Sequence, residues 1–117
     1  MKQSKIWGTT ECLESNPLCE LHRIAVLPGY RCSNHRHAHK WNLFYVERGE
    51  LHVIIEQADH NDEIKVWAGM VCRVGPGLFH RFENRSSQVV EAFELYFPET
   101  LSEDIERLDV GQKIVEE

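Results

Sequence analysis

Short apolar stretches separated by turn residues run along most of the chain, and several alternate apolar with polar positions as half-buried strands do. The predicted strands are 20–27, 40–47, 51–56, 63–67, 70–74, 78–84 and 89–97. The second and third of these are separated only by residues around Gly49, which predicts a hairpin there. Short strands at this spacing are typical of a sandwich or a barrel.

So many strands in 117 residues would leave exposed sheet edges unless the sheet closes on itself. We therefore expect an all-β fold, a closed or nearly closed antiparallel barrel, in a single domain over residues 1–117. A small ligand would bind at its mouth. After Pro98 the pattern changes, because Thr100 and Glu103 form a capping box and apolar residues follow at helical spacing. This predicts a short C-terminal helix over about 101–108.

Composition and charge narrow the classes of function. The formal net charge is −6 and the chain has no basic run, which argues against a nucleic-acid partner. No apolar run approaches the length of a transmembrane helix, and the N-terminus lacks a signal-peptide core, so we expect a cytoplasmic protein with no membrane partner. The four cysteines have neither CxxC nor zinc-ribbon spacing, and we expect them to be free thiols.

Three histidines, His35, His37 and His39, occupy every second position and would share one face of a strand. The outer two would lie about 13 Å apart along the strand. One ion cannot easily bind all three, because metal–imidazole bonds are only about 2 Å long. The metal-binding pair is therefore His35 with His37 or His37 with His39. The other histidines, His22, His52 and His60, are expected to be surface or structural residues.

Two segments resemble the conserved motifs of the cupin superfamily. In residues 29–49, which resemble the first motif, Asn42 stands where the motif has a glutamate, and the matching residues are Gly29, His35, His37 and Gly49. In residues 69–84, which resemble the second motif, Gly75 stands where the motif has a proline, and the matching residues are Gly69, Gly77, His80 and Asn84.

The cupin resemblance implies a jelly-roll barrel, or double-stranded β-helix, that holds a divalent transition-metal ion such as zinc, manganese, iron or nickel. It implies His35, His37 and His80 as ligands, with Asn42 entering from the next strand. It leaves His39 nearer the mouth, where a substrate contact is expected. Without a carboxylate ligand, the site should bind metal more weakly but act as a stronger Lewis acid. The alternative for Asn42 is a hydrogen bond to a ligand histidine or a water.

A closer resemblance extends over almost the whole chain. The stretches IWGTTECLES, HRIAVLPGY, HRFEN and EDIERLDVG make the sequence similar to the carboxy-terminal cupin domain of type II phosphomannose isomerase. This resemblance implies a metal-dependent isomerase or epimerase that acts on a sugar or sugar phosphate. Small single-barrel cupins often pair through their outer sheets, so the resemblance also implies a homodimer.

Isomerisation needs a base near the metal. Glu94 and Tyr96 share one side of the last predicted strand, and the sequence leaves open whether that side faces the interior. His39 is one candidate catalytic base, and Glu94 is another if that side faces the interior. A phosphate group could be bound by Arg31, Arg73 or Arg81.

Two other functions fit the same residues. The first is a non-catalytic cupin that binds a small ligand such as a sugar, which the missing carboxylate favours because a fold by itself specifies no chemistry. The second is an iron- or nickel-dependent oxygenase, for which ligation by histidines is tolerable.

Overall fold

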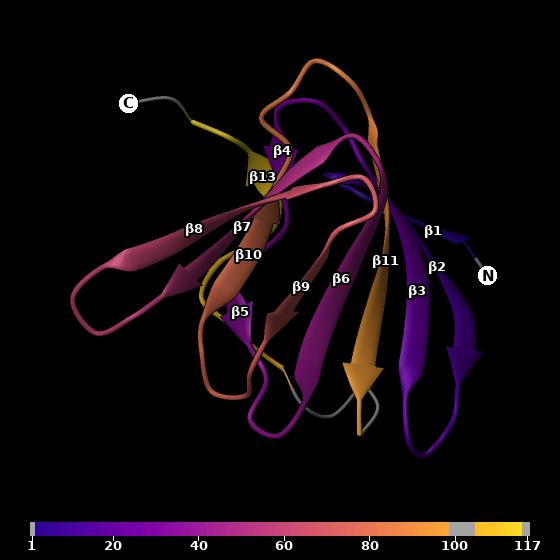
Figure 1. The fold of residues 1–117 in the computed structure, drawn as a ribbon, viewed down its shortest axis with the longest axis vertical. Helices are drawn as coiled ribbons and strands as arrows, with labels where there is room; N and C mark the ends of the chain where they lie inside the picture. Colours follow the sequence, from indigo (N-terminus) through magenta and orange to yellow (C-terminus); the bar gives the residue numbers. More distant parts are fainter. Residues whose placement is uncertain (1, 99–104, 116–117) are drawn as a thin grey trace.

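The computed structural model describes residues 2–98 and 105–115, which form two antiparallel sheets (Figure 1). The first sheet contains, in spatial order, β1 (Lys2–Lys5), β2 (Gly8–Ser15), β3 (Glu20–Val26), β11 (Val90–Phe97), β6 (Trp41–Arg48) and β9 (Val71–Val74). The second sheet contains β12 (Glu106–Arg107), β5 (His35–Arg36), β10 (His80–Glu83), β4 (Tyr30–Arg31) and β13 (Gln112–Lys113), with β7 (Glu50–Glu56) pairing with β10 and β8 (Asn61–Trp67). The all-β prediction is confirmed, and the two sheets are consistent with a jelly-roll.

Strand alternation places the interior side chains as the sequence predicts. Along β6, Asn42, Phe44 and Val46 are buried, whereas Tyr45 on the other face is 39% exposed. Along β11 the same period buries Glu94 and Tyr96 together with Val90 and Ala92. This settles the question that the sequence left open, because the side of β11 that carries Glu94 faces the interior.

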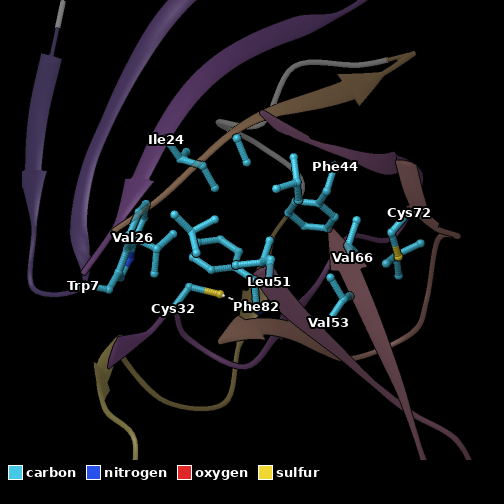
Figure 2. Packing of buried hydrophobic residues seen from close by; sticks show 14 of the residues in the cluster. Trp7, Ile24, Val26, Cys32, Phe44, Leu51, Val53, Val66, Cys72 and Phe82 are labelled. Atoms are coloured by element: carbon cyan, nitrogen blue, oxygen red, sulfur yellow. Dashed lines mark hydrogen bonds between the residues drawn. The ribbon is translucent and has the colours of Figure 1, made fainter. Parts of the chain in front are cut away.

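Aromatic side chains from both sheets fill the space between them (Figure 2). Phe82 on β10 packs edge-on against Trp7, with ring centroids 4.9 Å apart, and against Phe44 at 5.9 Å. All three are buried. Edge-to-face pairs of this kind stabilise a core beyond the area they remove from water. The core therefore ties the sheet that carries β6 to the sheet that carries β10, the two strands that supply Asn42 and His80.

The hairpin predicted around Gly49 is wrong. β6 and β7 follow each other in the chain, but β6 pairs with β11 and β9 in one sheet, whereas β7 pairs with β8 and β10 in the other. Both edges of β6 are already occupied, so the next strand cannot fold back onto it. Gly49, with φ of 95°, instead turns the chain from one sheet to the other.

The predicted C-terminal helix is also wrong where it can be compared with the structure. Residues 101–104 lie outside the described part of the chain, but Glu106–Arg107 form strand β12, which pairs with β5. The backbone N–H of Leu108 then donates to the carbonyl of Asn34 at 2.9 Å. Pairing with an available sheet edge overrides the helical pattern of this segment. Among the residues described there is no helix, and hence none long and apolar enough to cross a membrane.

An ion-pair group on β10 gives a testable contribution to stability. Glu83 is 4% exposed and accepts hydrogen bonds from Arg81 at 2.7 Å and Arg85 at 2.9 Å. Burial alone would raise the pKa of this carboxyl, but the two arginines outweigh it and hold the pKa below its ordinary value of 4.5. We expect Glu83→Gln to lower the free energy of unfolding by about 1–3 kcal/mol at pH 7.

A lowered pKa in the folded state means that this contribution is present above the ordinary carboxyl value and is lost as the pH falls through the folded value. Urea unfolding of both proteins between pH 7 and pH 3 should therefore show their difference shrinking at the acid end. Glu63→Gln is the matched control, because Glu63 also binds Arg85 but its side chain is 54% exposed. The control should cost less than about 1 kcal/mol. Equal losses from both variants would contradict the prediction.

Candidate metal centre and ligand cavity

Pairing between short strands brings two of the candidate ligands together. His35 on β5 lies directly opposite His80 on β10, and cross-strand partners point to the same side of a sheet. His37 follows immediately after the end of β5, where its carbonyl accepts a hydrogen bond from the backbone N–H of Gly77 at 2.7 Å. All three histidines are buried.

The three imidazoles form one compact group. Their ring centroids are 4.6 Å apart for His35 and His80, 5.1 Å for His35 and His37, and 5.5 Å for His37 and His80. One ring nitrogen from each lies within 4.8 Å of the others, which is close enough for a metal ion. A cluster of three histidines suits divalent transition metals such as zinc, iron, nickel or manganese.

Backbone carbonyls fix the orientation of two of these rings. His35 Nδ1–H donates to the carbonyl of Ser33 at 2.8 Å, and His80 Nδ1–H donates to the carbonyl of Leu78 at 2.9 Å. Each bond leaves Nε2 with its lone pair, as metal-binding histidines require. His35 Nε2 is buried and has no hydrogen-bond partner within residues 2–98 and 105–115. A buried nitrogen of this kind fits the coordination of an ion.

Burial also keeps two of these imidazoles neutral, those of His35 and His80. It holds the pKa of His35 well below 6.5, and the neighbouring His80 and His37 lower it further. Burial likewise lowers the pKa of His80 to about 4, against the opposing effect of its bond to Leu78. Neutral imidazoles are the form that binds metal, so near neutral pH His35 and His80 need no deprotonation to accept an ion.

Asn42 contacts the histidine group from β6. Its Oδ1 lies 3.1 Å from His80 Nε2, and the residue is completely buried. Because Nε2 carries a lone pair, an ion shared between this nitrogen and the amide oxygen would satisfy both acceptors. No carboxylate belongs to the group among the described residues, so the protein places three imidazole rings and an amide around the candidate site.

His39 lies apart from this group. β5 ends at Arg36, the chain bends at residues 38 and 39, and His39 is exposed. The alternation that would place it beside His37 stops with the strand. His39 is also absent from the lining of the cavity described next.

A cavity of about 470 Å³ adjoins the histidine group. Glu94 lines it and accepts a hydrogen bond from the Tyr96 hydroxyl at 2.7 Å. Burial raises the pKa of Glu94, although Tyr96, His22 and Asn42 oppose that effect. Burial, followed by the charge of Glu94, raises the pKa of Tyr96 well above 10. A buried carboxyl with a raised pKa beside a cavity is typical of a general acid or base. The side chains used below that line the cavity are Lys5, Thr10, His22, His35, Glu94, Tyr96 and Arg107.

Several of these cavity residues were not predicted as site residues, His22 and Arg107 among them. His22 shares the inner face of β3 with Ile24 and Val26, and this every-second-residue pattern was the available signal. Arg107 could not be found in the same way, because it faces the cavity through a two-residue strand in a segment predicted to be helical. The suggested phosphate ligands are engaged elsewhere: Arg31 pairs with Asp109, Arg73 lies over the Trp41 ring, and Arg81 pairs with Glu83.

The sequence matches the cupin domain family over residues 22–96. No protein of curated function is significantly similar to it. The structure is similar to capsular polysaccharide assembling protein CapF from Staphylococcus aureus, with a TM-score of 0.81 and 20% identity over 94% of this chain and 34% of that one.

Two oxalate decarboxylases have the same fold. The enzyme from Bacillus subtilis, described with Mn(II) centres, gives a TM-score of 0.77 and 19% identity over 91% of this chain and 30% of that one. The enzyme from Lactobacillus farciminis, in a formate complex, gives a TM-score of 0.80 and 14% identity over 92% of this chain and 33% of that one. The chain thus spans about a third of the length of each of these proteins, and at such identities the likeness concerns the fold.

Proposed function

This chain belongs to the cupin family, and from that premise we propose that it is a metal-binding cupin that acts on a small molecule held in the cavity. One observation carries the proposal: His35 belongs both to the histidine group and to the cavity wall. A ligand in the cavity would therefore lie next to an ion held by His35, His37 and His80, with Asn42 beside them.

The reaction we propose is isomerisation or epimerisation of a sugar or sugar phosphate. When bound, a divalent ion would supply Lewis-acid polarisation of neighbouring ligand oxygens. Glu94 Oε1, the carboxylate oxygen that does not accept from Tyr96, would take the proton from the carbon next to the sugar carbonyl. In isomerisation it would return this proton to the former carbonyl carbon, while the hydroxyl proton of the first carbon moves through solvent to the former carbonyl oxygen. In epimerisation the first carbon would instead regain a proton on its opposite face. The Tyr96 hydroxyl would hold the carboxylate in position during both transfers.

Two cations support an anionic form of the ligand. Arg107 lies opposite His35 in the β12–β5 ladder, on the same side of the sheet, and Lys5 also lines the cavity. Neither makes an ion pair with any residue that the structure describes. Two cations that line a cavity and make no such ion pair, in a chain of net charge −6, favour a phosphate or carboxylate group on the ligand.

Exchange of a sugar carbon-bound proton with solvent deuterium, followed by NMR over a panel of aldoses, ketoses and their phosphates, tests the reaction directly. We expect Glu94→Gln to slow exchange by about 10²- to 10⁴-fold with metal content unchanged. Glu91→Gln is the matched control, because Glu91 lies on the other face of β11 and pairs with Arg48. Equal rates in Glu94→Gln and wild type would remove Glu94 from the mechanism.

The same panel tests the cavity cations. We expect Arg107→Gln to weaken binding of phosphorylated sugars by about 10- to 100-fold while changing that of the unphosphorylated sugars little, since charged hydrogen bonds contribute about 1.5–3 kcal/mol. Arg36→Gln is the control, because Arg36 is adjacent to His35 on β5 and pairs with Glu106 outside the cavity. Calorimetric titration measures both variants. Equal weakening in both would argue against a phosphate site at Arg107.

The second candidate function is non-catalytic binding of a sugar or similar ligand. The observation in its favour is the composition of the histidine group, which contains no carboxylate among the described residues. Under this hypothesis the panel shows ligand binding by calorimetry but no deuterium exchange with any sugar. Oxygen uptake with bound iron or nickel would instead favour an oxygenase.

A further inference from the structure

A second group of metal-ligating side chains lies on the β2–β3 hairpin, away from the three clustered histidines. It contains Cys12, Glu20 and His22, and one donor atom from each lies within 4.8 Å of the others. His22 belongs to the cavity wall, as His35 does. Tyr96 lies between the two groups, with its ring centroid 5.9 Å from that of His22 and 5.2 Å from that of His37.

The antiparallel ladder explains why these three residues converge. Cys12 on β2 is the direct cross-strand partner of His22 on β3, so their side chains lie on one face. Glu20 precedes His22 by two positions on the same strand and shares that face. It is the face that carries the fully buried Ile24 and Val26 and is therefore turned toward the interior. The side chains of His22 and Glu20 are only 12% and 13% exposed.

Hydrogen bonds already order the group. His22 Nε2 lies 2.6 Å from Glu20 Oε1, and His22 Nδ1 lies 3.3 Å from the hydroxyl oxygen of Thr10. The Cys12 thiol makes only a long contact of 3.6 Å to the carbonyl of Glu14. The imidazole is thus held between an acidic group on one side and a hydroxyl on the other. That is the environment in which a histidine can bind an ion through one nitrogen and donate through the other.

We propose that Cys12, Glu20 and His22 form a second divalent metal site, for which zinc is the best match. Thiolate, imidazole and carboxylate are all established zinc donors, and the thiolate selects against hard ions such as manganese. Two negative ligands balance the charge of the ion, in contrast to the neutral histidine group. Three protein ligands leave a coordination position for water or a small anion. One of these ligands, His22, also lines the cavity.

Proton movements on binding can be written in full. The Cys12 thiol loses its proton to solvent as the sulfur bonds to the ion. His22 loses the proton on Nε2 and gains one on Nδ1, and Nδ1–H then donates to the Thr10 hydroxyl oxygen. Glu20 binds as the carboxylate. The net result is the release of about one proton for each ion bound at pH 7.

Cobalt(II), which replaces zinc and reports thiolate ligation by a charge-transfer absorption band in the near ultraviolet, tests the site on the full chain. We expect the wild-type protein to show this band and Cys12→Ser to lose it. Cys19→Ser should keep it, because Cys19 is a free thiol in the same hairpin but lies outside the group. The variant His37→Ala/His80→Ala should also keep the band, since the two histidines that it replaces belong to the other group. Calorimetry of the His37→Ala/His80→Ala variant with zinc, in buffers of different ionisation enthalpy, should give about one released proton for the site.

A His22→Gln substitution, made in the His37→Ala/His80→Ala variant and checked for native circular dichroism, provides a second test of the same site, because that background removes two ligands of the other zinc candidate. It should weaken zinc binding by more than tenfold, whereas Cys19→Ser in the same background should leave zinc binding unchanged. The proposal is overturned if the wild-type protein shows no thiolate band, or if the band survives in Cys12→Ser. It is also overturned if His22→Gln, correctly folded, binds zinc as tightly as the His37→Ala/His80→Ala parent. None of these results depends on the reaction proposed above.

Discussion

The variant His37→Ala/His80→Ala is expected to bind no manganese under conditions in which the wild-type protein binds about one equivalent. Two of the three clustered imidazoles are removed, and loss of residues that merely orient metal ligands already costs 10- to 100-fold in affinity. We therefore expect an affinity loss of more than about 100-fold. Manganese is the ion of choice because the thiolate of the proposed second site disfavours it. Electron paramagnetic resonance of free and bound manganese measures the effect.

His60→Ala is the matched control, because His60 is exposed, interacts with Asp59 and Asp62, and belongs to neither candidate metal group. It should bind manganese as the wild-type protein does, and circular dichroism should show all three proteins folded. Retention of full manganese binding by the double variant would place the ion elsewhere. Failure of the wild-type protein to bind manganese, iron, nickel or zinc would mean that the group lacks the charge to hold an ion, and the non-catalytic hypothesis would then be favoured.

Gly8→Ala should be the most destabilising single-methyl substitution that we propose. Gly8 has φ of 149°, and a Cβ at this position would lie 1.8 Å from the carbonyl oxygen of Ala25. The oxygen that it would meet belongs to the backbone, so no side chain can move aside and strands β2 and β3 would have to separate. We expect the free energy of unfolding to fall by about 3 kcal/mol or more, against a total of about 5–15 kcal/mol for a typical domain.

Gly29→Ala isolates the conformational part of this effect. Gly29 has φ of 80°, but nothing lies within 4 Å of an added Cβ. It should cost only the left-handed backbone strain of about 1–2 kcal/mol. Denaturant unfolding of the two variants beside wild type gives the comparison. If Gly8→Ala cost no more than Gly29→Ala, the close approach of β2 to β3 would contribute nothing to stability.

Long strands of this fold follow from the sequence pattern. β6 and β11 have eight residues each and carry enough alternation to predict which side chains share a face. Two-residue strands such as β5 and β12 carry no periodicity, since pairing with neighbours defines them. This is why the helical pattern near residue 105 and the glycine at position 49 were misleading. Near residue 105 an available sheet edge paired with the segment, and at Gly49 both edges of the preceding strand were already occupied.

For the candidate site, too, the sequence predicted what depends on the residue pattern and not what depends on strand pairing. The cupin resemblance of the two motif-like segments implied that His35, His37 and His80 would be close, and the structure places them together, while their role as metal ligands stays a prediction. The exclusion of His39 depends on where β5 ends, which alternation alone cannot give. The grouping of Cys12 with His22 depends on the register of a hairpin, and neither residue has a telling spacing in the sequence.

The pairing of β12 with β5 also bears on when the histidine group could take up the proposed ion during synthesis. His35 is held between His80 and Arg107, partners that emerge from the ribosome much later than His35 itself. A growing chain therefore exposes His35 and His37 long before it can enclose them. The three histidines can come together only after β10 has been made, and His35 has both of its cross-strand neighbours only after β12 has docked. If the group binds metal as we propose, the ion would be enclosed only from that stage onward.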